Sequence, residues 1–374
     1  MASFGAASEV RILMVAGGTG GHVFPALAVA EELRARAAHR GPLQPAYRIE
    51  FLGTKRPLEA QVIPGAGFPL RSVTAAGLKG IGGLRGLRNL LLLPLTALAA
   101  SRLLREFQPQ AVVGVGGYLA GPVMLEAALQ DIPTLLIEPN AVPGFTNRAL
   151  APMVRLAALG FEPAASCYGG KARLTGLPVR AAFERIPCKP HTPPFAVLVV
   201  GGSQGSKAIN DVMVQCAPIL QRESEWLEVI HQTGEKDYCA VRRAYQENGV
   251  RAQVHAFIHD MPGALAAADL VVSRSGAMAV AELAAAGRAA LLVPFPAAAD
   301  QHQLANARSF ERAGAARAIL QAELSAERLM AEIRLLLGQP ERLAAMERAA
   351  KSLARPGAAG RIADLVEEMV RSVS

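Results

Sequence analysis

Short apolar runs alternate along the chain with longer segments whose apolar residues recur at helical spacing. A short, continuous apolar run bounded by glycine or polar residues is typical of a strand buried on both faces, as in a parallel sheet. The pattern therefore predicts an α/β protein. We expect strands near residues 10–15, 48–52, 110–113 and 134–137 in the first half, and near 195–200, 228–231, 254–257, 270–273 and 290–294 in the second.

Three of these strands end in glycine-rich turns that lead into helical segments. The turns are residues 16–25, 114–118 and 201–207. Glycine lets the backbone approach a ligand closely, and the free N–H groups at a helix N-terminus favour phosphate. Because proline suits the first turn of a helix, we expect helices to start at Pro25 and after Pro122. The pattern indicates a protein that binds phosphorylated ligands.

The first turn does not match a dinucleotide-binding motif. Gly18 and Gly20 fit the first two glycines of G-x-G-x-x-G, but Val23 stands at the third. The second strand ends in residues 53–55, Gly-Thr-Lys, without the acidic residue that binds a ribose in such proteins. The turn at residues 201–207 also lacks the Gly-Lys-Ser/Thr triplet of a P-loop. NAD binding is therefore disfavoured.

The length of 374 residues favours two domains. A proline-rich stretch at residues 187–194 is predicted to be the linker between a first domain at 1–186 and a second at 195–357. The tail is helical in pattern with a break at 355–357, and we expect a C-terminal helix at about 358–374 to pack back onto the first domain.

Composition narrows the class of partner. A net charge of +8 favours anionic partners, but aromatic residues make up only 5% and no nucleic-acid-binding motif occurs, so nucleic acid is disfavoured. The four cysteines show no C-x-x-C spacing, so neither zinc nor a redox pair is expected, and free thiols suit a reducing cytoplasm. The N-terminal residues lack the basic region and apolar core of a secretory signal.

Residues 78–93 combine leucines with cations. Lys79, Arg85 and Arg88 alternate with apolar residues and precede a leucine run at 90–98, which Pro94 interrupts and which is shorter than the roughly 20 residues that span a bilayer. One interpretation is a loop and core helix with solvated arginines. The other is a surface that docks on anionic lipid.

The ordered set of motifs resembles the MurG family, the GT-B glycosyltransferases of family 28 that transfer N-acetylglucosamine in peptidoglycan synthesis. The resemblance runs nearly end to end, and it implies two Rossmann-like parallel-sheet domains. It rests on residues 17–25, 114–122, 138–140, 201–205, 274–282 and 300–306.

The resemblance implies that the second half binds UDP-GlcNAc and the first half binds the undecaprenyl-diphosphate-linked acceptor. Glu282 is then expected at the ribose and Ile258 at the uracil. The implied donor contacts are Thr19, Gly20, Gly21, Asn140, Arg180, Ser203, Ile258, Ala277, Met278, Ala279, Glu282, His302 and Gln303. The implied acceptor contacts are Gly17, Gly18, His22, Gly116, Gly117 and Tyr118.

The resemblance further implies a peripheral enzyme on the cytoplasmic face of the bacterial membrane, docked through residues 78–93, with other cell-wall synthesis proteins as further expected partners. The chain departs from the family in one motif. Residues 137–140 read Ile-Glu-Pro-Asn, where the family often has His-Glu-Gln-Asn. A mechanism that needs this histidine is therefore excluded.

Two residues are candidates for the base that deprotonates the acceptor hydroxyl. His22 has a suitable ordinary pKa and lies in the first turn, and Glu138 follows a buried strand. Either could instead orient a neighbouring group. Because no Asp-x-Asp occurs, no metal or other cofactor is expected, and helix N-termini with Arg180 would stabilise the leaving diphosphate.

Two other functions remain open at this point. A UDP-GlcNAc 2-epimerase would share the double-Rossmann architecture and the donor, but it has no need of the basic, apolar stretch at 78–88. A non-catalytic nucleotide-sugar-binding protein of the same fold is disfavoured because His22, Glu138, Glu282 and Gln303 are all present.

Overall fold

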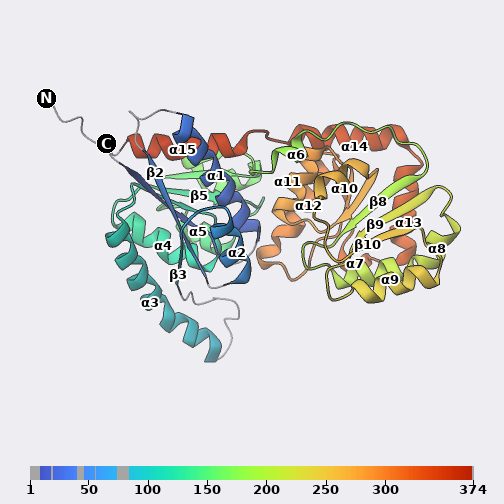
Figure 1. The fold of residues 1–374 in the computed structure, drawn as a ribbon, viewed down its shortest axis with the longest axis horizontal. Coiled ribbons are helices and arrows are strands. Elements are labelled where there is room, and N and C mark those ends of the chain that lie inside the picture. The colour runs from blue at the N-terminus through green and yellow to red at the C-terminus, as the bar shows by residue number, and fades with distance from the viewer. Residues whose placement is uncertain (1–8, 18–19, 40–45, 55, 74–83, 373–374) are drawn as a thin grey trace. The chain divides into compact units, whose positions relative to one another are not determined.

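The computed structural model describes residues 9–17, 20–39, 46–54, 56–73 and 84–372, and for residues 84–95, 118 and 299 it describes the backbone alone. The chain divides into two compact units (Figure 1). The first unit comprises residues 1–178 and 357–374, and the second comprises residues 179–356.

The first unit is a parallel sheet of seven strands in the order β3-β2-β1-β4-β5-β6-β7. Its elements are β1 (Val10–Val15), α1 (Gly20–His39), β2 (Tyr47–Gly53), α2 (Pro57–Gly65), β3 (Leu70–Ser72), α3 (Leu84–Phe107), β4 (Ala111–Gly114), α4 (Gly117–Leu129), β5 (Thr134–Glu138), α5 (Phe145–Leu150), β6 (Leu156–Leu159), β7 (Ala172–Leu174) and α15 (Ala358–Arg371). The central strands β1, β4 and β5 are mostly apolar and buried, as expected for strands covered by helices on both faces.

The C-terminal helix α15 belongs to the first unit although it follows the second in sequence. It packs against α1 and crosses it in Figure 1. The guanidinium of Arg36 on α1 donates to Asp364 Oδ1 at 2.6 Å and to the carbonyl of Gly360 at 2.9 Å. The apolar face of α15, with Ile362 and Val366 fully buried, supplies the packing.

The second unit repeats the same plan with six parallel strands in the order β10-β9-β8-β11-β12-β13. Its elements are α6 (Ala181–Glu184), β8 (Phe195–Val200), α7 (Lys207–Gln215), α8 (Ala217–Arg222), β9 (Leu227–Gln232), α9 (Tyr238–Glu247), β10 (Ala252–His255), α10 (Met261–Ala267), β11 (Leu270–Ser273), α11 (Ala277–Ala286), β12 (Ala290–Leu292), α12 (His302–Arg312), β13 (Ala316–Ala318), α13 (Ala326–Leu337) and α14 (Pro340–Leu353). The two parallel α/β sheets confirm the predicted fold class.

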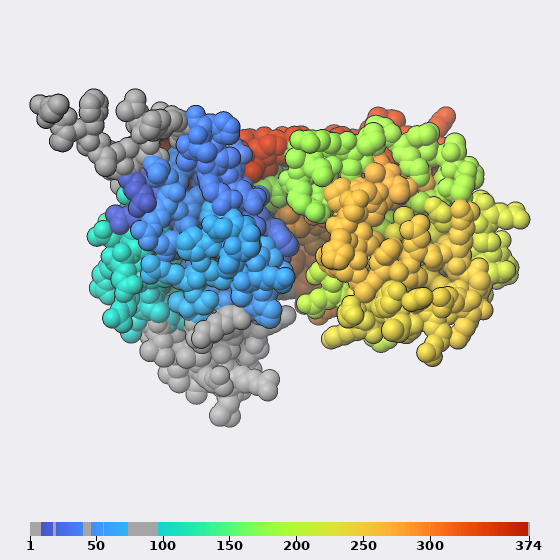
Figure 2. Space-filling model, in the orientation of Figure 1, coloured from blue at the N-terminus to red at the C-terminus, as the bar shows by residue number. Residues whose placement is uncertain are grey.

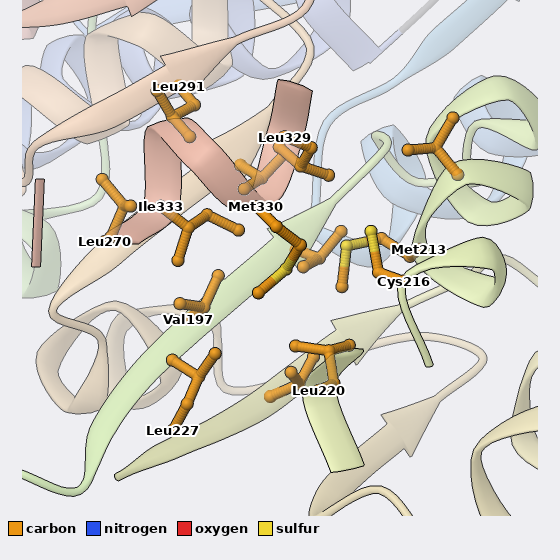
Figure 3. Close-up of a cluster of buried hydrophobic side chains, with 14 of the residues drawn as sticks. Val197, Met213, Cys216, Leu220, Leu227, Leu270, Leu291, Leu329, Met330 and Ile333 are labelled. Atoms are coloured by element: carbon orange, nitrogen blue, oxygen red, sulfur yellow. The ribbon is translucent and has the colours of Figure 1, made fainter. Parts of the chain in front are cut away.

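The core of the second unit follows from the two-residue period of a strand. Phe195, Val197 and Val199 of β8 face the same apolar cluster, in which α13 contributes Leu329 and Ile333 (Figure 3). On the outside, α9 buries Val241 and Tyr245 and leaves Arg242, Arg243 and Glu247 exposed. In Figure 2, the yellow atoms of this part of the chain lie on the surface of the second unit.

The proline-rich stretch at 187–194 is held against the second unit. His191 hydrogen-bonds Asp269 Oδ1 at 2.9 Å through Nδ1 and Glu347 Oε2 at 3.1 Å through Nε2, and Lys189 pairs with Asp269 Oδ2 at 2.6 Å. The fully buried Arg288 donates to the carbonyl of residue 187 at 3.1 Å. These contacts are why the division between the units falls after residue 178, earlier than the expected linker.

Two helices start earlier than expected. α1 begins at Gly20 and α4 at Gly117, so Pro25 and Pro122 lie inside their helices rather than at the starts. A proline has no N–H, so the hydrogen bond to the carbonyl four residues before it is missing. Both helices accommodate this missing bond near their N-termini. The consequence is that His22 lies in the first turn of a helix rather than in a loop.

No helix among the described residues is both long enough and apolar enough to cross a membrane. The expected lipid-docking stretch lies largely outside the described residues, since residues 74–83 are not described and residues 84–93 are described only as backbone of α3.

Candidate active site

The strand order places a topological switch point in each sheet. In the first unit, β1 and β4 are neighbours whose following connections run to opposite sides, and Val15 pairs with Gly114 at their carboxyl ends. In the second unit, β8 and β11 have the same relation, and Val200 pairs with Ser273. Ligands of open α/β sheets bind outside the strand ends at such points.

At the first switch point, the two glycine turns touch. Gly117 has a φ of 83°, and a Cβ there would lie 3.2 Å from the carbonyl oxygen of Gly17 and 3.6 Å from Cε1 of His22. A side chain would therefore disturb both turns, and the positive φ independently favours glycine. The structure thus brings Gly17, His22 and Gly117 together at the N-termini of α1 and α4.

The orientation of the His22 ring assigns its tautomer. Nδ1 lies 3.2 Å from the carbonyl oxygen of Gly17. A carbonyl oxygen only accepts hydrogen bonds, so Nδ1 carries the proton in the neutral ring. Nε2 is then the nitrogen whose lone pair accepts a proton.

Glu138, the last residue of β5, is completely buried. Its Oε1 accepts hydrogen bonds from the backbone N–H of Asn140 at 2.8 Å and from the side chain of Asn140 at 3.4 Å. Its Oε2 accepts from Asn147 Nδ2 at 2.7 Å and from the Tyr168 hydroxyl at 3.4 Å. Burial raises the pKa of Glu138 to about 7, although these donors partly oppose the shift.

This arrangement orients the Asn140 loop. Both carboxylate oxygens of Glu138 accept hydrogen bonds, from Asn140 in the loop after β5, from Asn147 in α5 and from Tyr168 between β6 and β7, so the carboxylate links three segments of chain. The Asn140 residue itself is only partly buried. Glu138 can therefore hold Asn140 in place, whereas its own oxygens are enclosed by protein.

At the second switch point, two turns interlock. Gly205 has a φ of 74°, and a Cβ there would lie 1.8 Å from the carbonyl oxygen of Thr233. Gly234 has a φ of 78°, and its Cβ would lie 2.2 Å from the carbonyl oxygen of Gln204. This contact leaves Ser203 exposed at the tip of the turn before α7.

Helices α11 and α12 are joined at their N-termini. The Ser275 hydroxyl donates to the carbonyl of Gln303 at 2.8 Å, and Asn306 Nδ2 donates to the carbonyl of Ser275 at 3.1 Å. The Gln303 side chain accepts from the N–H of Phe295 at 3.0 Å. The N-termini of the two helices are therefore adjacent, and the positive end of each favours an anion.

Ala277, Met278 and Ala279 form the first turn of α11 and are half-buried, and His302 opens α12. Glu282 lies one turn further along α11. Burial raises the pKa of Glu282 to about 7, and the positive charge of Arg180, just before α6, opposes this shift.

Residues 12–158 match the model of the glycosyltransferase family 28 N-terminal domain, and residues 196–362 match that of the glycosyltransferase family 28 C-terminal domain. The chain belongs to glycosyltransferase family 28. The resemblance inferred from the sequence is therefore confirmed.

A relative from Anaeromyxobacter sp. (strain Fw109-5) is 47% identical over 365 residues, which cover 97% of this chain and 94% of the relative. Its name is UDP-N-acetylglucosamine--N-acetylmuramyl-(pentapeptide) pyrophosphoryl-undecaprenol N-acetylglucosamine transferase. The crystal structure of Acinetobacter baumannii MurG matches with a TM-score of 0.78 at 32% identity, covering 96% of this chain and 99% of that one.

A UDP-GlcNAc 2-epimerase from Neisseria meningitidis, whose structure was determined bound to UDP-GlcNAc, matches with a TM-score of 0.66 at 12% identity, covering 96% of this chain and 100% of that one. At that identity, the likeness shows a shared fold alone.

Three of the expected site residues are not fully described by the structure. Gly18 and Thr19 are not described, and of Tyr118 only the backbone is described. Within the described ranges, no group of three or more His, Cys, Asp or Glu residues could hold a metal ion.

Three residues outside the expected ligand contacts build these turns. Gln232 bridges two loops of the second unit, Arg274 donates to the carbonyls of Val293 and Pro294 at 3.0 and 3.2 Å, and Asn147 binds Glu138. Gln232 could have been identified from the sequence, because it is a polar residue at the carboxyl end of a predicted strand, where ligands of parallel sheets bind.

Proposed function

We propose that this chain transfers N-acetylglucosamine from UDP-GlcNAc to the undecaprenyl-diphosphate-linked N-acetylmuramyl-pentapeptide, which converts lipid I to lipid II in peptidoglycan synthesis. The observation that carries the proposal is the end-to-end identity of 47% with a relative of that name. The geometry of the switch points supports it, because each unit presents a glycine turn at a helix N-terminus.

The donor binds to the second unit. Glu282 accepts hydrogen bonds from the ribose, and Ile258 binds the uracil. The diphosphate lies against Ser203, Arg180 and the first turn of α11, where helix N–H groups and a cation stabilise the charge of the leaving UDP. His302 and Gln303 bind the sugar hydroxyls.

The acceptor diphosphate binds to the glycine turns of the first unit, at Gly17, Gly18, Gly116 and Gly117, with Tyr118 beside them. His22 Nε2 removes the proton from the C4 hydroxyl of the acceptor sugar. The resulting oxygen attacks the anomeric carbon as the bond to UDP breaks. The electron pair of that bond leaves with UDP, and the anomeric configuration inverts.

Glu138 acts as a positioning residue rather than as the base. Its buried oxygens accept hydrogen bonds from Asn140, Asn147 and Tyr168, and these contacts support a role in orienting Asn140 toward the sugar. His22 offers the better base because its tautomer carries a lone pair on Nε2.

The chain works at the inner face of the bacterial membrane, docked through residues 78–93. The alternation of cations with leucines over 78–88 supports this role, as does the exposure of Leu98 further along α3, at 63%.

The test is transfer of labelled GlcNAc from UDP-GlcNAc to a short-chain lipid-diphosphate acceptor, with and without a chelator. We expect acceptor-dependent release of UDP in both conditions, and a loss in kcat of about 10²-fold or more for His22→Ala. Formation of UDP-ManNAc from UDP-GlcNAc alone would instead identify an epimerase. Near-normal turnover of His22→Ala would refute the base.

A further inference from the structure

Gln232 is a buried amide at the point where three strands of the second unit end. It is the last residue of β9 and only 2% exposed. In the sheet it pairs with Val200 of β8 on one side and with His255 of β10 on the other. The loops that follow β8 and β10 therefore start beside it.

The side chain of Gln232 bridges these two loops. Its Nε2 donates to the carbonyl of Gly202 at 2.9 Å, and its Oε1 accepts from the N–H of Ile258 at 2.8 Å. Since a carbonyl only accepts and a backbone N–H only donates, the two contacts assign the orientation of the amide. A single neutral side chain thus satisfies one backbone group in each loop.

Backbone contacts, such as the hydrogen bond from the N–H of Gly234 to the carbonyl of Ala256 at 3.1 Å, also support the two loops beside Gln232, but apolar packing contributes little there. Gly202 has a φ of 97°, and no atom lies within 4 Å of the place where its Cβ would be. Its carbonyl also accepts from the N–H of Gly205 at 3.0 Å, within the same turn. In the other loop, Phe257 is 49% exposed. Hydrogen bonds rather than apolar packing hold these loop segments.

We propose that Gln232 is a positioning residue that couples the diphosphate-binding turn to the uracil-binding loop, so that both are in place before the donor arrives. The inference rests on the proposed function, which assigns Ser203, next to Gly202, to the diphosphate and Ile258 to the uracil. Pre-organised loops lower the cost of ordering on binding. Gln232 therefore acts on donor affinity without contacting the reacting atoms.

Two substitutions separate the contacts. Gln232→Met keeps the volume and removes both hydrogen bonds. Gln232→Glu keeps an acceptor for Ile258, but its ionised carboxylate faces the Gly202 carbonyl and repels it. When protonated, the same carboxyl group can donate to Gly202 and accept from Ile258, as the amide does. The matched control is Gln253→Met, at an exposed position on the neighbouring strand β10.

The measurements are KM for UDP-GlcNAc, KM for the lipid acceptor and kcat, together with calorimetric binding of UDP between pH 5.5 and 8.5. We expect Gln232→Met to raise KM for the donor about tenfold at every pH, because two buried hydrogen bonds are lost. The KM for the acceptor stays unchanged, and Gln253→Met behaves as the natural chain does. Gln232→Glu binds UDP weakly at pH 8.5 and regains most of its affinity at pH 5.5.

Two results would overturn the coupling by Gln232. One is a donor KM for Gln232→Met equal to that of the natural chain. The other is a UDP affinity of Gln232→Glu that follows Gln232→Met at every pH, which is what a purely structural role would produce. Failure of the proposed function is a separate outcome, because the natural chain itself would then neither bind UDP nor transfer GlcNAc.

Discussion

The raised pKa of Glu138 predicts how the free energy of unfolding changes with pH. Its carboxyl group is fully buried, and burial raises its pKa from 4.5 to about 7. Between these two pH values, the folded chain binds more protons at this site than the unfolded chain does. The free energy of unfolding therefore falls as the pH rises through this window.

The size of the effect follows from the two pKa values. One pH unit of difference corresponds to about 1.4 kcal/mol, so ionising Glu138 inside the fold costs about 3 kcal/mol by pH 8. Glu138→Gln has the same shape and cannot ionise. It replaces one acceptor oxygen by an amide nitrogen, at a cost of about 1–3 kcal/mol for each buried donor left without its acceptor, and this cost does not change with pH.

The assay is urea unfolding of the natural chain and of Glu138→Gln, followed by circular dichroism between pH 4.5 and 8. The natural chain is expected to be the more stable of the two at pH 4.5, and the difference should shrink or reverse by pH 8. Glu282 titrates in both proteins, so its contribution cancels. Glu162→Gln, at an exposed position of the same unit, controls for the loss of one formal charge.

A difference in unfolding free energy that stays constant from pH 4.5 to 8 would refute the reasoning. It would mean that the Glu138 carboxylate is not desolvated by the fold. A difference that grows with pH would show instead that the hydrogen bonds from Asn140, Asn147 and Tyr168 outweigh burial.

Three further predictions concern the second unit. Gly205→Ala should raise the donor KM and lower the melting temperature, because its Cβ would lie 1.8 Å from the carbonyl oxygen of Thr233 in the facing turn. Gly170→Ala is the control, because no atom lies within 4 Å of the place where its Cβ would be. An unchanged donor KM for Gly205→Ala would contradict the interlock of the two turns. Hydrogen bonds that the His191 ring donates to two carboxylates raise its pKa to about 9. The natural chain should therefore lose about 3 kcal/mol of stability as the pH rises from 6.5 to 9. His191→Gln should lack that slope in urea titrations, and a parallel slope would contradict this. Ser275→Ala removes the 2.8 Å hydrogen bond to the Gln303 carbonyl and should raise the donor KM about fivefold in the transfer assay. An increase confined to the acceptor KM would show that this hydrogen bond does not support donor binding.

The strands adjoining the glycine turns were predictable because their burial is local to the sequence. A strand covered on both faces must be a continuous apolar run, and β8 and β11 have the bounds that the pattern predicts. The short strands β3, β6, β7 and β13 were missed. Each has only three or four residues, and the hydrogen bonds that define it come from partners distant in sequence.

The sequence by itself determined the α/β class, the glycine turns and the family. The class and the turns depend on residues close together along the chain, and the family depends on the order of such local motifs. Only the tertiary structure decided what those turns contact. The meeting of Gly117 with Gly17 and His22 depends on the pairing of β1 with β4, which are almost a hundred residues apart. The contacts of Glu138 with Asn147 and Tyr168 and the bridge made by Gln232 arise in the same way, since these partners lie on other segments or in other loops. Local patterns specify which residues can bind a phosphate or a proton, whereas the sheet order specifies which of them meet.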